Sequence, residues 1–307
     1  MGYTDLHFLK LLDLLLPNLD LYQEMLVAQA FIRNSHPSKD TVGIEGRLIL
    51  QLGGSDPQLL SECCYKAYKL GYDAVNLNVG CPSSRVVNGN IGAVLLKDID
   101  LLVTCIASMI QASPLPVSVK TRIGIDNDPD VLNDLVSSLL SVGCNELIMH
   151  ARRAWLSGLD PKQNREIPPL DYGRVCKLKQ DFPDMNVMLN GGISGISDIL
   201  PYVEKVDGFM LGRIFYKDPL HAAKIMAEFG NMVRPIKNVV EAYLVYSEQA
   251  CAKGIKPRWL LRHLPSFFKG FAGAGASRSK MNSLMNLDYI DKLAINDLFS
   301  KLEAKRH

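Results

Sequence analysis

Short apolar runs alternate with helical periods between residues 21 and 211 of the chain. The runs are nearly continuous stretches of Leu, Ile, Val and Met, which is typical of parallel strands buried on both faces. This pattern predicts an α/β fold, either a (β/α) barrel or a doubly wound sheet. The predicted strands span residues 21–27, 48–52, 74–79, 117–123, 146–151, 186–190 and 208–211.

Helices are predicted between the strands, for example over 57–70, 101–111 and 131–142. Asp56 and Asp130 suit N-caps, and Gly71 and Gly143 suit C-terminal stops. After residue 234 the strand pattern ends. Helices then follow over 241–253, 257–271 and 288–303, with a Gly/Ala/Ser-rich break at 270–279. We therefore expect a catalytic barrel over 1–234 and a small helical domain over 235–307.

Polar side chains at the strand ends favour the barrel. A TIM barrel gathers the carboxyl ends of all its strands around one mouth, whereas a doubly wound sheet uses only its switch point. The predicted strands number seven, and glycines after the last two suit the phosphate loops that follow strands seven and eight. We therefore expect a TIM (β/α)8 barrel whose first strand is missing before Met1. The strand-end residues are Glu24, Gln51, Asn78, Lys120, Arg122, His150, Asn190 and Arg213.

Composition and cysteine usage restrict the class of protein. Hydrophobic residues make up 48% of the 307 residues, and the net charge is only +2. The seven cysteines are scattered without a CxxC pair, which indicates reduced thiols in the cytoplasm and neither disulfides nor a metal site. The apolar stretch 8–16 is short and interrupted by Lys10 and Asp13. We expect a soluble cytoplasmic protein, monomeric in solution, with no membrane partner and no metal.

The segment Asn-Leu-Asn-Val-Gly-Cys-Pro, residues 76–82, leaves a strand and enters a polar, glycine-bearing loop. A cysteine at a barrel mouth can act as a nucleophile or as a general acid. An isolated cysteine is more often a small buried filler. The Gly-Cys-Pro setting beside Asn78 favours a catalytic Cys81.

Three further strand-end side chains have competing interpretations. Lys120 and Arg122 alternate with Val119 and Thr121, so both can point into the barrel. An inward Lys120 predicts an anionic or electron-rich ligand, although an ion pair with Glu24 is the alternative. His150 ends a strand and is equally compatible with a satisfied core residue.

Two glycine motifs follow the last two predicted strands. Asn190-Gly191-Gly192 and Gly212-Arg213 expose backbone N–H groups, and Arg213 adds a forked donor. Each motif alone suits an ordinary turn, but two on successive strand ends favour a cofactor that bears a phosphate.

Basic and aromatic residues point to RNA. Arg152, Arg153 and Trp155 follow His150 and suit stacking and phosphate contacts, unless Trp155 packs inward. Residues 249–287 contain seven Lys or Arg and no acidic residue, with Trp259 among them. Such a stretch is a footprint for a polyanion, with a merely basic surface as the alternative.

Taken in order along the chain, these motifs resemble the tRNA-dihydrouridine synthases. The matching segments are 76–82, Val-Lys-Thr-Arg-Ile-Gly-Ile-Asp at 119–126, His-Ala-Arg at 150–152, Asn-Gly-Gly-Ile at 190–193 and Gly-Arg at 212–213. Trp-Leu-Ser-Gly-Leu at 155–159 and Asn-Arg-Glu-Ile-Pro-Pro-Leu-Asp-Tyr at 164–172 resemble the bacterial A subfamily, which is associated with tRNA positions 20 and 20a. The family's usual Ala-Pro-Met segment of the first strand is absent, in agreement with the strand count.

The resemblance implies an FMN-bearing barrel followed by a tRNA-binding helical domain, with NADPH as the electron donor. It implies that Cys81 protonates carbon 5 of a D-loop uridine after hydride reaches carbon 6, and that Asn78 holds the uracil. Arg152 and Arg153 would meet the RNA. The flavin ring and ribityl chain would be held by Gln51, Lys120 and His150, and the FMN phosphate by Asn190, Gly191, Gly192, Gly212 and Arg213.

Two other functions stay open at this point. One is a flavin barrel that acts on a small pyrimidine, as in dihydroorotate dehydrogenase-like enzymes, which need no basic helical domain. The other is a non-catalytic tRNA-binding relative that lacks the first barrel strand. Tight, salt-sensitive tRNA binding argues against the first, and a bound flavin argues against the second.

Overall fold

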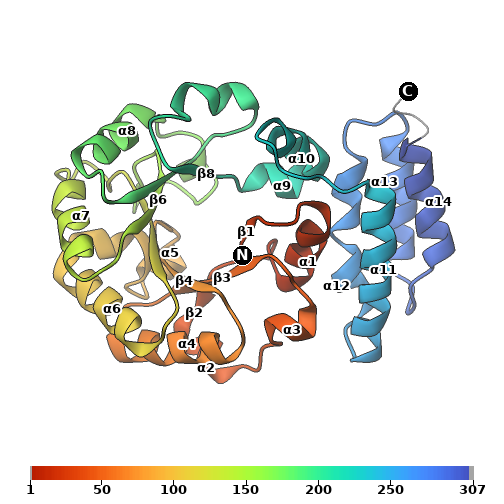
Figure 1. Ribbon diagram of the computed structural model, residues 1–307, viewed down its shortest axis with the longest axis horizontal. Coiled ribbons are helices and arrows are strands. Elements are labelled where there is room, and N and C mark those ends of the chain that lie inside the picture. Colours follow the sequence, from red (N-terminus) through yellow and green to blue (C-terminus); the bar gives the residue numbers. More distant parts are fainter. Residues whose placement is uncertain (1, 304–307) are drawn as a thin grey trace. The chain divides into compact units, whose positions relative to one another are not determined.

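The computed structural model describes residues 2–303 (Figure 1). They form two compact units, one made of residues 22–41 and 47–211, the other of 2–21, 42–46 and the chain from 212 onward. Met1 and the last four residues of the predicted helical domain, 304–307, lie outside the described residues.

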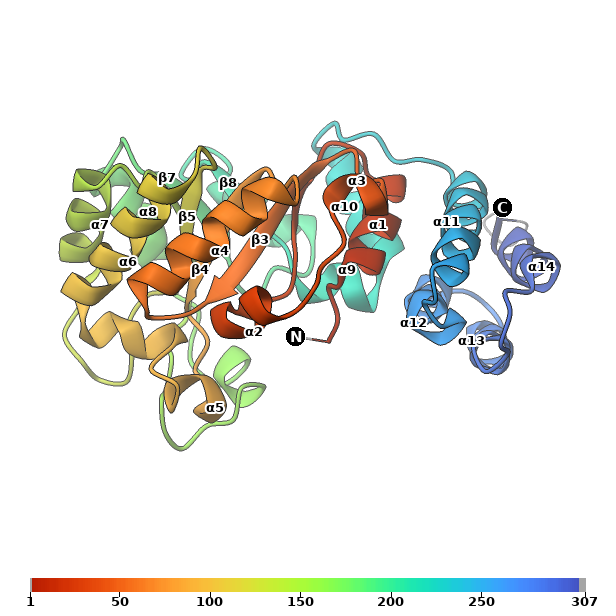
Figure 2. The same cartoon turned by 90° about the horizontal axis from the view of Figure 1, so that it is seen from below.

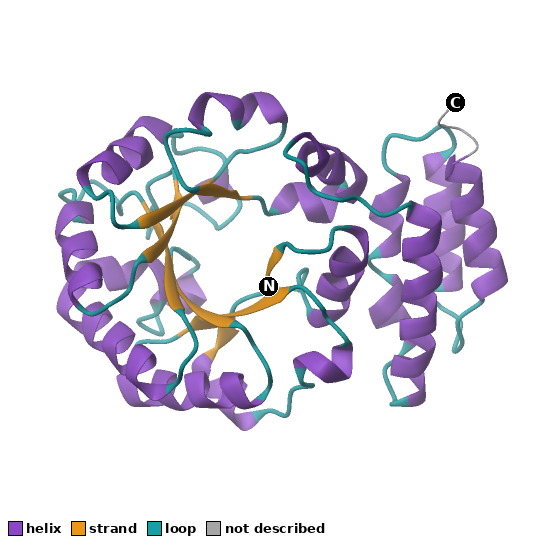
Figure 3. Cartoon of the chain, in the orientation of Figure 1, coloured by secondary structure: helices purple, strands orange, loops and turns teal. Residues whose placement is uncertain are grey.

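The first unit is built around a parallel sheet, which Figure 3 shows as a curved arc of strands. The sheet has eight strands in the order β1-β3-β4-β5-β6-β7-β8, and β2 also pairs with β3. The predicted α/β class is therefore confirmed, with strands that follow one another around the sheet as in a TIM barrel. The strands are β1 (Asp20–Tyr22), β2 (Leu26–Val27), β3 (Arg47–Gly53), β4 (Ala74–Val79), β5 (Val117–Arg122), β6 (Glu146–His150), β7 (Asn186–Asn190) and β8 (Gly208–Met210).

The predicted strand over 21–27 is in fact two short strands, β1 and β2. Between them the Gln23 N–H still donates to the Ile49 carbonyl at 2.9 Å, and its buried side chain accepts from the Tyr72 hydroxyl. Leu26 resumes the parallel register opposite Leu52. The eight strands thus occupy seven positions, and among residues 2–303 no hydrogen-bonded pairing joins β8 to β1.

Helices cover the outer side of this sheet (Figure 1). Asp56 caps its helix as predicted, by accepting from the N–H groups of Gln58 and Leu59. Asp130 accepts from Leu132 N–H, but Val131 is the N-cap residue, one position later than predicted. The helices are α2 (Ala28–Arg33), α4 (Pro57–Lys69), α5 (Ser84–Val87), α6 (Ile99–Ala112), α7 (Leu132–Ser141) and α8 (Tyr172–Asp181), with α3 (Lys39–Val42) at the unit boundary.

The second unit is helical, and Figure 2 shows its C-terminal helices gathered together. The predicted break at 270–279 is wrong, because a helix begins at Ala274 after Gly273, which adopts a left-handed φ of 79°. The predicted helix over 257–271 is also wrong in extent: it ends at Leu261, and a 3₁₀ turn over Leu264–Phe268 follows. The helices are α1 (Leu6–Leu15), α9 (Arg213–Lys217), α10 (Pro219–Glu228), α11 (Ile236–Ala252), α12 (Pro257–Leu261), α13 (Ala274–Leu284) and α14 (Lys292–Glu303).

Helix α1 was not predicted, because Lys10 and Asp13 interrupt its apolar run. The Asp13 carboxylate is buried and accepts from the backbone N–H groups of Glu45 and Gly46 at 3.1 and 2.8 Å. The charge therefore stabilises a neighbouring loop of the same unit. Helix α1 packs against α11 and α12. Within residues 2–303, none of the helices combines the length and apolar character that crossing a bilayer requires.

Candidate functional site

Polar side chains of β3, β4 and β5 form a row joined by hydrogen bonds, in which Gln51 and Asn78 lie near the carboxyl ends of β3 and β4. Gln51 donates from Nε2 to Asn76 Oδ1 at 2.8 Å, and Asn78 donates from Nδ2 to Gln51 Oε1 at 3.0 Å. Asn76 continues the row by donating to Ser118 Oγ at 2.9 Å. The row fixes both Gln51 and Asn78, so two predicted site residues lie side by side at the sheet edge.

Cys81 lies in the loop after β4 and its side chain is partly exposed. Asn78 Oδ1 accepts from the backbone N–H groups of Gly80 and Cys81 at 3.1 and 3.0 Å. The Cys81 carbonyl accepts from Ala93 N–H at 3.0 Å, and a Cβ on Gly92 would come within 2.6 Å of that carbonyl oxygen. The backbone that carries the thiol is therefore held on both sides of the peptide, and Gly92 permits the close approach.

Four other thiols have no exposed surface and contrast with Cys81. Burial raises the pKa of Cys63 and Cys64 to about 12 and that of Cys105 and Cys144 to about 11. These thiols stay protonated, out of contact with solvent, and serve as packing groups. Cys81 is the cysteine that leaves a strand end at the sheet edge.

Lys120 crosses the sheet to reach Asn190. Its Nζ donates to Asn190 Oδ1 at 3.0 Å, although β6 separates β5 from β7 in the sheet. Only a side chain on the inner face of a curved sheet can span a strand in this way. Lys120 makes no ion pair within the described residues, so the alternative of a salt bridge with Glu24 is not realised. Burial, together with the nearby Arg122 charge, lowers the Lys120 pKa to about 7.

His150 is buried at the end of β6 and lies opposite Asn190 in the register. Gly191 approaches it so closely that an added Cβ would lie 2.2 Å from His150 Cδ2. Gly191 has a φ of 111° and Gly192 a φ of 71°, both in the region that favours glycine. The Tyr172 hydroxyl also donates to the Gly191 carbonyl. The glycine pair is therefore required locally for packing on His150 as well as for backbone shape.

Arg122 ends β5 with only 4% of its surface exposed. Its Nε donates to the Gly80 carbonyl at 3.1 Å, and its Nη1 donates to the Asn164 carbonyl at 3.0 Å. Within the described chain no carboxylate pairs with it. Burial lowers its pKa to about 10, a change that the charges of Arg165 and Arg152 reinforce, yet it remains a cation at neutral pH. The inner edge of the sheet thus carries positive charge near Cys81.

The segment after His150 is folded back by its own polar groups. Arg152 donates to the Pro168 carbonyl. Arg153 donates from Nε to the Asp126 carbonyl at 2.9 Å and from Nη2 to the Ile125 carbonyl at 3.3 Å. Both arginines and Trp155 are partly exposed. Asn164, to which no role was assigned from the sequence, is fully buried in this segment. Its place at the start of the motif 164–172 is the sequence signal that could have singled it out.

Gly212 and Arg213 belong to the second unit. They follow β8 directly in the chain, and Gly212 is the N-cap residue of α9. The structure therefore brings Gln51, Asn78 and the Cys81 backbone into one hydrogen-bonded group and Lys120 onto Asn190 in the first unit. The predicted phosphate residues are divided between the two units.

The second unit carries an exposed aromatic side chain between two cations. Trp259 is 48% exposed, and the guanidinium carbons of Arg258 and Arg262 lie 5.7 and 4.9 Å from the centre of its ring. Arg262 is held in turn by an ion pair to Asp5 at 2.5 Å. This arrangement offers a stacking surface with fixed positive charge.

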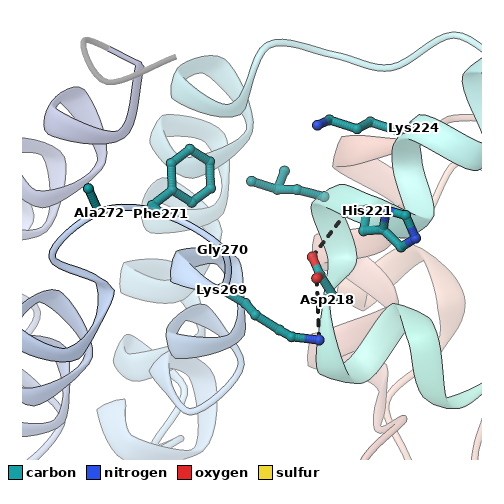
Figure 4. A pocket seen from close by; sticks show the side chains of 8 residues that line it. Asp218, His221, Lys224, Lys269, Gly270, Phe271 and Ala272 are labelled. Carbon is teal, nitrogen blue, oxygen red and sulfur yellow. Dashed lines mark hydrogen bonds and ion pairs between the residues drawn. The ribbon is translucent and has the colours of Figure 1, made fainter.

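A cavity of about 350 Å³ lies in the same unit, between the start of α10 and the loop 269–272 (Figure 4). Lys269 and Asp218 point toward each other across it and form an ion pair at 3.4 Å. His221 and Lys224 add two more basic side chains to the lining. The cavity is therefore lined by more cationic groups than carboxylates.

A parallel sheet of barrel order, with a cysteine, a lysine and amides beyond the carboxyl ends of its strands, defines a TIM-barrel enzyme. Two solved structures of morphinone reductase share this fold with TM-scores of 0.53 and 0.51, each at 10% sequence identity. The first alignment covers 76% of this chain and 83% of that one. At this identity the likeness concerns the fold alone.

The family model described as dihydrouridine synthase matches residues 1–299. The chain is 40% identical over 283 residues to the tRNA-dihydrouridine(20/20a) synthase of Shewanella oneidensis, covering 91% of this chain and 84% of that protein. It is 41% identical over 281 residues to the protein of the same name from Escherichia coli K12, covering 89% and 81%. The chain belongs to the dihydrouridine synthase family, and it is a flavin-dependent oxidoreductase that modifies tRNA.

Proposed function

We propose that this protein reduces uridine to 5,6-dihydrouridine at positions 20 and 20a in the D-loop of tRNA, with FMN as its flavin and NADPH as the electron donor. The observation that carries the proposal is the partly exposed Cys81, held by Asn78 near the partly buried Lys120 and the buried Arg122, in a chain of this family. The relatives named for positions 20 and 20a supply the substrate position.

The flavin fits the residues at the inner edge of the sheet. Gln51, Lys120 and His150 would hold its ring and ribityl chain. Lys120 supports this assignment, because a partly buried ammonium group without a carboxylate partner is costly and suits an electron-rich ring atom. When bound, FMN supplies the hydride that uridine receives at carbon 6. The protein's own groups orient the substrate, exclude water and supply the proton.

The phosphate of FMN is assigned to backbone N–H groups after β7 and β8. Glycines at these positions suit the assignment, because a side chain on Gly191 or Gly192 would meet neighbouring atoms within 2.5 Å. The forked guanidinium of Arg213 complements them as a charge-assisted donor. The residues proposed to hold the phosphate are Asn190, Gly191, Gly192, Gly212 and Arg213.

The Cys81 thiol is the proposed general acid. Hydride addition at carbon 6 leaves negative charge on the uracil ring, and a protonated thiol poised at carbon 5 neutralises it by donating its proton. The cationic Lys120 and Arg122 stabilise that negative charge from the inner edge of the sheet. Asn78 would hold the uracil through its second Nδ2 hydrogen, because its Oδ1 accepts from the Cys81 loop and its first Nδ2 hydrogen is donated to Gln51.

We propose that residues of both units contact the tRNA. Arg152 and Arg153 would meet the RNA beside the site, with Trp155 available for stacking. The helical region over 235–307 would bind the tRNA body, and the exposed Trp259 between two arginines is the feature that supports this assignment. We place catalysis in residues 1–234 and expect the protein to act in the cytoplasm as a monomer.

A reaction with defined components tests the function. Purified protein, FMN and NADPH are mixed with an unmodified tRNA transcript, and dihydrouridine is located by mass spectrometry. The proposal requires product in the D-loop, with NADPH preferred to NADH. Reduction of free uracil or uridine at a comparable rate would instead favour a small-pyrimidine enzyme.

The tRNA-binding surface has its own test. Trp259→Ala should weaken tRNA binding about 5- to 100-fold, the range for loss of one stacked base. Tyr289→Ala is the matched control, because Tyr289 is 61% exposed and lies outside the acid-free stretch. Equal effects of the two substitutions would contradict the assignment of Trp259.

A further inference from the structure

Asn164 is the centre of a buried hydrogen-bond group that closes the loop 155–164. Its side chain is fully buried. Its Oδ1 accepts from Trp155 N–H at 2.7 Å, and its Nδ2 donates to the carbonyls of Trp155 and Leu159 at 2.9 and 3.1 Å. Both the oxygen and the NH₂ group of the amide are therefore used to hold this loop in one conformation.

The backbone of Asn164 connects this loop to Arg122. The Asn164 carbonyl accepts from Arg122 Nη1 at 3.0 Å, and Arg122 Nε donates to the Gly80 carbonyl at 3.1 Å. A buried guanidinium must satisfy its donors, and this one has backbone carbonyls in place of a carboxylate. Since its fork is planar and rigid, moving one carbonyl shifts the guanidinium and with it the other carbonyl.

The second carbonyl belongs to the peptide that joins Gly80 to Cys81. The Cys81 N–H of that same peptide donates to Asn78 Oδ1 at 3.0 Å. Arg122 and Asn78 therefore hold the two polar atoms of one peptide plane. Rotation of this plane changes the direction of the Cys81 Cα–Cβ bond. A displacement of about 1 Å at a reacting group can reduce the rate by about two orders of magnitude.

We propose that Asn164 is a positioning residue for the Cys81 thiol, acting through Arg122 and the Gly80 carbonyl. The loop that carries Trp155 and the loop that carries the proton donor are then set by one continuous buried group. This inference rests on the proposed role of Cys81 as the proton donor. Asn164 touches neither substrate nor flavin in this scheme.

The test separates the two half-reactions of the flavin-loaded protein by rapid kinetics. Flavin reduction by NADPH does not use the thiol, whereas oxidation of reduced flavin by saturating tRNA does. In Asn164→Ala the first rate should stay within about twofold of the wild type, and the second should fall about 10- to 100-fold. Asn133→Ala is the matched control, because Asn133 is exposed and its side chain accepts from Arg174 Nη2 at 2.9 Å, away from Arg122 and Cys81.

A double-mutant cycle with Cys81→Ala decides whether Asn164 acts through the thiol. In the Cys81→Ala background, Asn164→Ala should slow the tRNA-dependent step by less than about twofold further. Slowing by the same factor in both backgrounds, or equal slowing of both half-reactions, would overturn the inference. If Cys81→Ala alone leaves the tRNA-dependent step unchanged, the proposed function of Cys81 fails instead.

Arg122→Lys supplies a second variant in case Asn164→Ala does not retain flavin. Lysine keeps the cation but cannot hold two carbonyls with a planar fork. Arg122→Lys should slow the tRNA-dependent step by at least about tenfold. In the Cys81→Ala background the same substitution should slow that step by less than about twofold further. A wild-type rate in Arg122→Lys would contradict the connection.

Discussion

The N-cap of α1 gives a quantitative prediction about stability. The Asp5 carboxylate accepts from Phe8 N–H at 2.9 Å, pairs with Arg262 at 2.5 Å and lies 3.1 Å from His263 Nε2. Burial acts to raise its pKa, but the hydrogen bond and charge of His263 and the Phe8 N–H outweigh it, so the pKa is lowered to about 2. Asp5 thereby joins α1 to the C-terminal helices of the same unit.

The expected magnitude follows from that pKa. A change from 3.8 to about 2 corresponds to roughly 2 kcal/mol of stabilisation of the charged form. Asp5→Asn keeps a good cap and loses the charge, so it should cost about 2 kcal/mol of unfolding free energy. Asp5→Ala should cost about 3 kcal/mol, because the cap is also lost. Asp56→Ala removes a cap without an ion pair and should cost about 1 kcal/mol.

Urea unfolding measures these differences. The chain has two tryptophans, so in a Trp155→Phe background Trp259 reports on the second unit, which holds Asp5 and where it stacks on Arg262 at 4.9 Å. In a Trp259→Phe background Trp155 reports on the first unit, which holds Asp56. Because the folded pKa is depressed, the stabilisation by Asp5 is complete above about pH 4 and is lost as the pH falls toward 2. The difference in unfolding free energy between the wild type and Asp5→Asn should therefore shrink as the pH falls from about 4 to 2. A pH-independent difference, or equal losses in Asp5→Ala and Asp56→Ala, would refute this reasoning.

Two further predictions concern the flavin site. Because an electron-rich ligand raises the lowered pKa of Lys120, flavin binding should take up a proton, and FMN affinity measured by fluorescence should fall as the pH rises from about 7 to 9. Lys120→Met should remove that dependence, and a pH-independent wild type would contradict it. Gly191→Ala should cost about 3 kcal/mol in urea unfolding and weaken FMN binding, because its Cβ would lie 2.2 Å from His150 Cδ2. Gly143→Ala, with a φ of 85° but nothing within 4 Å, should cost only about 1 kcal/mol, and equal costs would exclude the clash.

Periodicity and caps predicted those elements whose stability is local. Asp56 and Gly71 mark the ends of α4 because capping and a left-handed φ depend on neighbouring residues only. Helix α1 was missed because its two charges serve distant partners: Asp13 holds the loop at Gly46, 33 residues away. No local pattern identifies such a partner.

The same distinction applies to the site. Gln51, Asn78 and Cys81 were predicted from strand ends, and a parallel sheet brings strand ends together. The hydrogen bonds by which Arg122 joins the Gly80 and Asn164 carbonyls were not predicted, since each carbonyl is 42 residues away from it in the chain. Composition was also misleading: the Gly/Ala/Ser-rich segment predicts a break, whereas the left-handed Gly273 is the N-cap residue of α13 and alanines lie in its first turn.

The most direct test of the central claim compares the rate at which Cys81→Ala forms dihydrouridine with the rate of the wild type. Single-turnover reactions of the FMN-loaded, prereduced proteins with unmodified tRNA are quenched and mapped by mass spectrometry. We predict product at positions 20 and 20a with the wild type, and a rate lower by about 10²- to 10⁴-fold with Cys81→Ala at unchanged tRNA affinity. Product formed at the wild-type rate by Cys81→Ala would contradict the role of the thiol, and no product with either protein would contradict the proposed reaction.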